Sequence, residues 1–182
     1  MPITPPIFEA PKVDSTGIQD AILREDNELD RRSASAKKLI RRYTYWALGL
    51  GAIPIPFVDA AGVLGAQIKM LRELSHLYGV EFSETRTKAI VSALISTIGG
   101  GIISIAVVGS LLKLIPVVGA GLGLIAMPAV GAAVTLTLGN IFMMHFESGG
   151  TLLDFDAAAM REHFKTEFRK NRIVVEEIRR NP

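Results

Sequence analysis

The sequence predicts an all-α protein: a helical, membrane-associated bundle built around a Gly/Ser-rich hydrophobic hairpin. Apolar residues recur at helical spacing in the charged segments, and no stretch shows the alternating pattern that is typical of a β-strand. A long central block is almost free of charge. Hydrophobic residues make up 49% of the 182 residues and charged residues 21%, which is a high apolar share for a water-soluble domain.

The distribution of proline and charge divides the chain into four segments. Residues 1–15 hold four prolines and are expected to be disordered. Residues 16–45 are expected to form a charged cytoplasmic helical segment, residues 46–150 a membrane-associated helical domain, and residues 151–182 a C-terminal amphipathic helix. Both flanks are densely charged, whereas Lys113 is the one charged residue between positions 89 and 144.

Two uncharged stretches predict a membrane hairpin with spans at about 89–112 and 117–141. The first stretch is 24 residues long, which gives roughly 36 Å at about 1.5 Å per residue and exceeds a hydrocarbon core of about 30 Å. Pro116 and Gly119 favour a turn between the spans. We therefore expect a multi-pass protein of the bacterial inner membrane, with both termini cytoplasmic.

The stretch 46–67 is apolar apart from Asp59, but Pro54 and Pro56 interrupt it, and helix interiors tolerate proline poorly. If this stretch crossed the membrane, the basic residues on its two sides would be separated by the bilayer, contrary to the positive-inside bias. We expect a broken interfacial or re-entrant element here. A further membrane crossing is the alternative.

Two amphipathic helices are predicted outside the hairpin. Residues 60–78 repeat apolar side chains at helical spacing and end at Gly79, a good C-terminal cap. Ser83 is a suitable N-cap for the helix that follows. Residues 155–180 carry a second apolar stripe. Both helices are expected to present cytoplasmic surfaces to a partner.

Small residues recur at four-residue spacing in both spans, and in lipid such residues let helices approach closely. This pattern predicts that the spans associate or repack, so that the protein is a possible homo-oligomer. The alternative is that these residues only pack the hairpin against itself. The predicted helix-packing residues are Ser96, Gly100, Ser104, Gly119, Gly123, Gly131 and Gly139.

A basic cluster followed by interfacial aromatic residues predicts contact with the surface of the lipid bilayer. The alternative is a solvated helix face that is neutralised by the acidic residues upstream of it. Those acidic residues, together with a net charge of only +2, argue against nucleic acid as a partner. The predicted membrane-surface residues are Lys37, Lys38, Arg41, Arg42 and Trp46.

Asp59 and Asn140 are the candidate intramembrane polar residues, because an ionisable group at membrane depth is a functional candidate by default. An N-cap is the alternative role for Asp59. The chain has no phosphate-binding loop, no cysteine and no histidines at ligand spacing. We therefore expect no enzymatic activity, no cofactor and no metal site.

The blocks 53–59, 67–70 and 77–79, followed by 114–119 and 146–150, resemble the YcjF-like family (domain of unknown function 697) in their order and spacing. The resemblance covers roughly residues 50–150. It implies a GTPase-associated membrane domain that works with a small GTPase-type protein of the Era-like or dynamin-like superfamily. The chain departs from the fused members in having no nucleotide-binding domain, so the resemblance implies a separate GTPase partner and carries over no catalytic residue.

These observations predict a non-enzymatic membrane anchor and effector of a GTPase partner. Two alternatives belong to other classes. One is a pore-forming or membrane-inserting, toxin-like helical module, whose hydrophobic hairpin is hidden until it inserts. The other is a small transporter subunit that uses Asp59 and Asn140 at membrane depth, although two spans are few for a transporter.

Overall fold

The computed structural model describes the backbone of residues 15–51, 58–112 and 119–180, and the side chains of residues 17–50, 62–98 and 128–178. All the regular structure in these ranges is helical, which confirms the all-α prediction. The predicted disorder of residues 1–15 falls almost entirely outside the described residues. The helices are α1 (Ser15–Gly51), α2 (Val58–Tyr78), α3 (Glu84–Leu112), α4 (Gly119–Glu147) and α5 (Arg161–Arg180).

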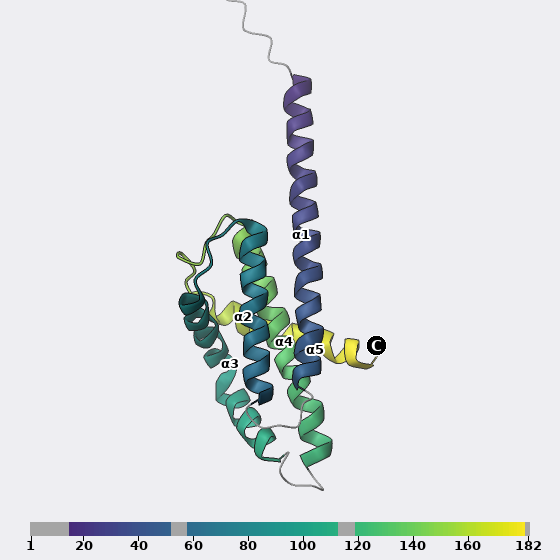
Figure 1. Ribbon diagram of the computed structural model, residues 1–182, viewed down its shortest axis with the longest axis vertical. Coiled ribbons are helices and arrows are strands. Elements are labelled where there is room, and N and C mark those ends of the chain that lie inside the picture. The colour runs from purple at the N-terminus through teal and green to yellow at the C-terminus, as the bar shows by residue number, and fades with distance from the viewer. Residues whose placement is uncertain (1–14, 52–57, 113–118, 181–182) are drawn as a thin grey trace, which may run out of the picture.

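Helices α1 to α4 run alternately down and up the long axis of the molecule, and α5 lies across them (Figure 1). Helix α4 is central, since it packs against each of the other four helices. Its inward side chains Leu138, Ile141 and Phe142 are fully buried. The predicted hairpin therefore corresponds to the antiparallel pair of α3 and α4, whose tip lies outside the described residues.

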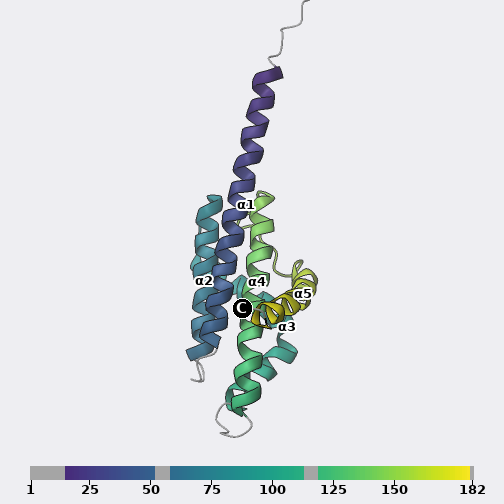
Figure 2. The ribbon, with the colours of Figure 1, turned by 90° about the vertical axis from the view of Figure 1, so that its right-hand side faces the viewer.

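Helix α1 is one continuous helix of 37 residues and passes through the predicted boundary at residues 45 and 46. Its C-terminal half buries one face in the bundle, through Ala36, Ile40, Tyr43 and Ala47. Its N-terminal half extends alone beyond the other helices, as both views of the ribbon show (Figures 1 and 2). All side chains from residue 17 to residue 32 are exposed.

The ends of α2 agree with the sequence pattern. The helix ends at Tyr78, and Gly79 adopts a φ of 69°, a left-handed conformation that favours glycine. The amide of Val80 donates to the carbonyl oxygen of Ser75 at 2.8 Å and closes the cap. Ser83 lies directly before α3, and its Oγ accepts a long hydrogen bond of 3.5 Å from the amide of Arg86.

The last helix begins at Arg161, six residues later than the expected start at residue 155. The side chain of Asp154 accepts the amide of Thr151 at 2.6 Å, and Asp156 accepts the amide of Ala158 at 2.8 Å. These side-chain bonds to the backbone hold turns in place of a helix. Residues 152–154 and 157–160 are accordingly turns.

Among the described residues, one helical segment is long and apolar enough to cross a membrane. It is Pro128–Glu147, with 20 residues and a mean hydropathy of 1.5, and 61% of it is buried inside the protein. The rest of the predicted hairpin includes residues 99–127, whose side chains lie outside the described ones. The multi-pass topology therefore stays a prediction.

Candidate functional site

The helix ends that meet at one end of the bundle come from the least charged parts of the chain. Asp59 is the one charged residue from position 43 to position 68, and Lys113 the one from 89 to 144. The end of α1 and the start of α2 lie toward the same end of the molecule as the end of α3 and the start of α4 (Figures 1 and 2). The charged half of α1 projects from the opposite end. The molecule is therefore polarised along its long axis.

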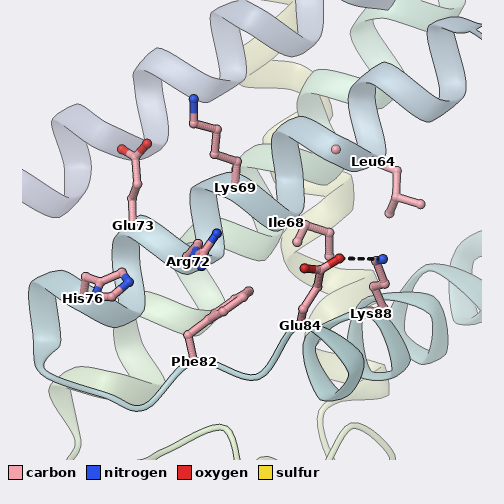
Figure 3. Close-up of a pocket in the computed structure, with 10 residues that line it drawn as sticks. Leu64, Ile68, Lys69, Arg72, Glu73, His76, Phe82, Glu84 and Lys88 are labelled. Atoms are coloured by element: carbon pink, nitrogen blue, oxygen red, sulfur yellow. Dashed lines mark ion pairs between the residues drawn. The ribbon is translucent and has the colours of Figure 1, made fainter.

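A groove of about 610 Å³ lies between the outer face of α2 and the beginning of α3 (Figure 3). Its apolar lining comes from Leu64, Ile68 and Phe82, and charged side chains surround this lining. Ile68 is 9% exposed and Leu64 is 39% exposed, so Ile68 lies deeper in the groove than Leu64. The charged or titratable lining residues are Lys69, Arg72, Glu73, His76, Glu84 and Lys88.

Both carboxylates in the groove are already paired. Glu73 of α2 forms an ion pair with Arg42 of α1, and the hydroxyl of Tyr43 donates to its Oε1 at 2.6 Å. Glu84 pairs with Lys88 at 2.7 Å, and this hydrogen bond and the charge of Lys88 lower the pKa of Glu84. Ion pairs inside the protein therefore largely neutralise the negative charge of the groove.

Two cations in the groove form no ion pair within 4.0 Å in the part of the chain that the structure describes, although the charge of one of them, Arg72, contributes to the lowered pKa of Glu84. Lys69 lies over the ring of Trp46, with Nζ 5.9 Å from the ring centroid, and Arg72 lies over Phe82 at 5.5 Å. Figure 3 shows Arg72 and Phe82 close together at the centre of the groove. An apolar floor beside unpaired cations suits a segment that combines apolar side chains with carboxylates.

Tyr43 of α1 is buried beneath the groove and holds one of its lining residues, Glu73. Its side chain is 3% exposed, and burial together with Glu73 raises the pKa of its phenol to about 12. Tyr78 is held in the same way at the end of α2, where its hydroxyl donates to Glu147 of α4 at 2.8 Å. Burial and Glu147 raise the pKa of Tyr78. Both phenols therefore stay protonated and fix α2 against its neighbours.

The predicted membrane-surface residues divide into two groups. Arg42 and Trp46 face α2, where they contact Glu73 and Lys69. The remaining three, Lys37, Lys38 and Arg41, are exposed on α1. Of these, Lys37 and Arg41 line a second groove, of about 440 Å³, between α1, α4 and α5.

The two candidate intramembrane polar residues lie on different helices. Asp59 is in the first turn of α2, but its side chain is outside the described ones. Asn140 lies on α4 and lines the groove between α1, α4 and α5 together with Lys37 and Arg41. Nothing in the described residues brings Asn140 to Asp59.

The described members of the predicted helix-packing set face α1, α2 or solvent. A Cβ atom at Gly131 would lie 3.4 Å from Val63 of α2, and one at Gly139 would lie 2.6 Å from Ile40 of α1. Ser96 of α3 is exposed, and its hydroxyl donates to the carbonyl of Ala93 at 2.8 Å. The remaining members lie outside the described side chains: Gly100, Ser104, Gly119 and Gly123.

Two buried hydrogen bonds that tie α4 to its neighbours were not predicted from the sequence. Gln67 of α2 donates to Thr135 at 3.2 Å, and Asn171 of α5 donates to Thr137 at 3.1 Å. The hydroxyl side chains of Thr135 and Thr137 inside the apolar helix α4 are the signal that could have indicated them. In the described part of the chain, no group of three or more His, Asp or Glu residues could hold a metal ion.

Comparisons with known proteins give the family. The family described as a domain of unknown function (DUF697) matches residues 21–172. Magnetosome membrane protein 22 of Magnetospirillum gryphiswaldense is 33% identical over 148 residues, which cover 81% of this chain and 76% of that protein. A UPF0283 membrane protein of Shewanella oneidensis is 36% identical over 85 residues, which cover 46% of this chain and 21% of that protein.

No solved structure matches the chain. The family match covers far more than half of the chain, and it includes most of α1, the α2–α3 groove and the start of α5. Both relatives carry the name of a membrane protein. The chain belongs to the DUF697 family, the domain of unknown function that its sequence resembles.

Proposed function

We propose that the chain is a non-enzymatic integral membrane protein that serves as the membrane anchor and effector of a separate GTPase-type partner. The observation that carries this proposal is the polarity of the bundle, with uncharged helix ends at one end and charged helices at the other. Charged side chains are costly in lipid. The uncharged end is therefore the part that enters the bilayer.

The lengths of the helices support insertion. Helices α3 and α4 have 29 residues each, which gives roughly 43 Å at about 1.5 Å per residue and exceeds a hydrocarbon core of about 30 Å. In this arrangement α3 and α4 cross and return, and the chain termini stay on the cytoplasmic side. The names of the two relatives as membrane proteins agree with this location.

The α2–α3 groove is the proposed contact surface for the partner. It lies on the outer face of α2 and combines an apolar floor with the unpaired cations Lys69 and Arg72. Its chemistry fits a helix or loop that carries apolar residues and carboxylates. The GTPase nature of the partner comes from the family resemblance.

Cysteine labelling tests the membrane part, because the natural chain has no cysteine. Lys113→Cys lies in the connection between α3 and α4, and Glu81→Cys lies in the exposed connection between α2 and α3. In sealed vesicles of known orientation, an impermeant maleimide should label Glu81→Cys from the cytoplasmic side and Lys113→Cys from the opposite side. Labelling of both from the same side, with release by carbonate, would contradict a spanning hairpin.

A separate experiment tests the partner part. Crosslinking in mild detergent, followed by affinity capture of the full chain, should recover a P-loop GTPase. The double variant Lys69→Glu with Arg72→Glu should lose this partner, whereas Arg24→Glu on the projecting half of α1 should keep it. Repeated capture without any P-loop protein would refute the GTPase partner and leave the membrane assignment intact.

A further inference from the structure

The groove between α1, α4 and α5 has a polar end and an apolar end. Its volume is about 440 Å³. Because α1 and α4 run in opposite directions, Lys37, Arg41 and Asn140 lie toward the charged end of the bundle. Tyr45 and Leu136 lie toward the uncharged end. The polarity of the groove therefore runs in the same direction as the polarity of the whole bundle.

The polar end of the groove offers hydrogen-bond donors that the described residues leave unused. Lys37 and Arg41 are exposed, and neither forms an ion pair with a described residue. The side-chain amide of Asn140 is half-buried and has no hydrogen-bond partner in the same part of the chain. No carboxylate is among the described residues that line the groove. Two cations beside a free amide suit a phosphate group.

The groove lies at the height where the bundle changes from charged to uncharged. The close contact of Ile40 with Gly139 places these two positions level with each other. From Gly119 to Leu138, α4 has 20 residues without a charge, which is roughly 30 Å at about 1.5 Å per residue and matches a hydrocarbon core of about 30 Å. Helix α1 carries no charge beyond Arg42. A bilayer around the uncharged end therefore has its phosphate layer at the polar end of the groove.

The orientation of α5 agrees with this height. The helix lies across the other four in both views (Figures 1 and 2), so it is parallel to the bilayer surface when the long axis of the bundle is perpendicular to that surface. Val174 and Ile178 of α5 line the groove. Ile173 is 63% exposed and Val174 is 41% exposed. Exposed apolar side chains on a helix of this orientation are suited to contact with acyl chains.

We propose that this groove binds one anionic phospholipid of the cytoplasmic leaflet. The lipid phosphate lies between Lys37 and Arg41 and accepts a hydrogen bond from the amide of Asn140. One acyl chain passes along Tyr45 and Leu136 into the bilayer. Basic pockets between helices on the cytoplasmic side are suited to anionic headgroups. The proposal rests on the membrane insertion that is part of the proposed function.

Quenching by brominated lipid tests whether the groove is occupied. The chain has a single tryptophan, Trp46, which contacts Lys69 of α2 and does not line this groove. The variant Tyr45→Trp with Trp46→Phe moves the fluorophore into the groove. In phosphatidylcholine vesicles, a minor share of brominated phosphatidylglycerol should quench this variant more strongly than the same share of brominated phosphatidylcholine. Equal quenching by the two lipids would refute a site for an anionic lipid.

Two pairs of substitutions that remove the same net charge test the cations. Lys37→Gln with Arg41→Gln changes the groove, whereas Arg31→Gln with Lys38→Gln removes two cations of α1 that do not line it. All four residues are exposed, so both pairs should keep the helical circular dichroism. Added to the tryptophan variant, the first pair should abolish the preference for phosphatidylglycerol and the second should keep it. Equal effects would show a general attraction of anionic lipid to the basic helix and overturn the site.

Binding in neutral detergent separates a lipid from a soluble phosphate compound. Native mass spectrometry of the full chain should show one bound phosphatidylglycerol, and Lys37→Gln with Arg41→Gln should weaken this binding at least about tenfold. Glycerol 1-phosphate has a phosphate group but no acyl chain, and it should not displace the lipid at equal concentration. Displacement would overturn the lipid as the ligand.

Carbonate extraction distinguishes failure of this site from failure of the membrane assignment. Release of the full chain from vesicles would overturn both. A chain that stays in the membrane but shows no preference for phosphatidylglycerol would overturn the lipid site alone. The GTPase-capture experiment above is independent of this result, because it changes residues of the α2–α3 groove.

Discussion

Gly139 of α4 lies so close to Ile40 of α1 that a Cβ atom at position 139 would be 2.6 Å from Cγ2 of Ile40 and 3.2 Å from its Cβ. Ile40 is 1% exposed, and its branch at Cβ leaves its Cγ atoms little freedom to move. The two helices therefore approach each other as closely as the side chain of Ile40 allows. This contact joins α1 to the central helix of the bundle.

Gly139→Ala should destabilise the protein for this reason. Alanine favours a helix over glycine by about 1 kcal/mol, but overpacking of a tight contact typically costs about 1–3 kcal/mol and here meets a stiff side chain. We expect a net loss in the free energy of unfolding, measured by thermal unfolding of the full chain in detergent. In a Gly139→Ala background, Ile40→Ala should cost less than it does in the wild type.

Gly65→Ala is the matched control, since a Cβ atom at position 65 of α2 would meet nothing within 4 Å. It should leave stability unchanged or raise it by up to about 1 kcal/mol. If the two alanine variants were equally stable, the close approach at Gly139 would have no energetic importance.

Tyr43→Phe should weaken the junction of α1 and α2. It removes the hydrogen bond of 2.6 Å from the buried phenol to Glu73, and a bond of this kind contributes about 1–2 kcal/mol. Thermal unfolding should show this loss. Tyr45→Phe is the control, because Tyr45 is 51% exposed and should tolerate the change.

A double-mutant cycle isolates this interaction. In a Glu73→Ala background, Tyr43→Phe should cost much less than in the wild type, and additive losses would show that the hydrogen bond contributes nothing. Burial and Glu73 raise the pKa of the Tyr43 phenol from 10.0 to about 12. The corresponding stability is present below pH 10 and falls as the pH rises toward 12.

Local sequence signals predicted much of the fold. The end of α2 at Gly79 and the start of α3 after Ser83 depend on capping residues within a few positions. The absence of strands in the described part of the chain followed from the apolar periodicity. The continuity of α1 through Trp46 was not predicted, although no proline lies between Ser15 and Pro54 to end the helix.

The groove could not be predicted, because its residues meet across long separations in sequence. Arg42 and Glu73 are 31 positions apart, and no periodicity of a single helix indicates that they pair. Glu73 lies on α2 among other charged residues and has no motif of its own. The packing of α1 and α2 around Tyr43 gives this carboxylate its position.

Thr137→Val should destabilise the contact between α4 and α5. Thr137 is fully buried and accepts a hydrogen bond of 3.1 Å from Asn171, which is 7% exposed. Valine has the same shape but leaves the buried amide of Asn171 without this partner, at a cost of about 1–3 kcal/mol. The midpoint of thermal unfolding in detergent should fall.

Replacing both partners distinguishes the lost hydrogen bond from a change in packing. Thr137→Val with Asn171→Leu should cost less than the sum of the two single changes, because no buried amide is then left unpaired. Thr166→Val on the exposed face of α5 serves as the control and should have little effect. Additive losses in the double variant would refute the importance of this bond.

The turn between α4 and α5 should lose stability in acid through Asp154. The hydroxyl and the amide of Thr151 donate to its Oδ1 at 2.7 Å and 2.6 Å, and these bonds lower the pKa of Asp154 from 3.8 to about 2. A carboxyl group whose pKa is lower in the folded state stabilises that state above its unfolded pKa. This contribution should therefore be present above about pH 4 and disappear as the pH falls toward 2.

Thr151→Val removes the hydroxyl donor and should move the pKa of Asp154 back toward 3.8, so that the acid-dependent loss of stability becomes smaller. Thr151→Ser keeps a hydroxyl at the same position and should preserve the lowered pKa. Titration of the Asp154 carboxyl carbon by nuclear magnetic resonance measures both values directly. Equal pKa values in the valine and serine variants would show that the hydroxyl does not hold the carboxylate, and that the amide of Thr151 alone is responsible.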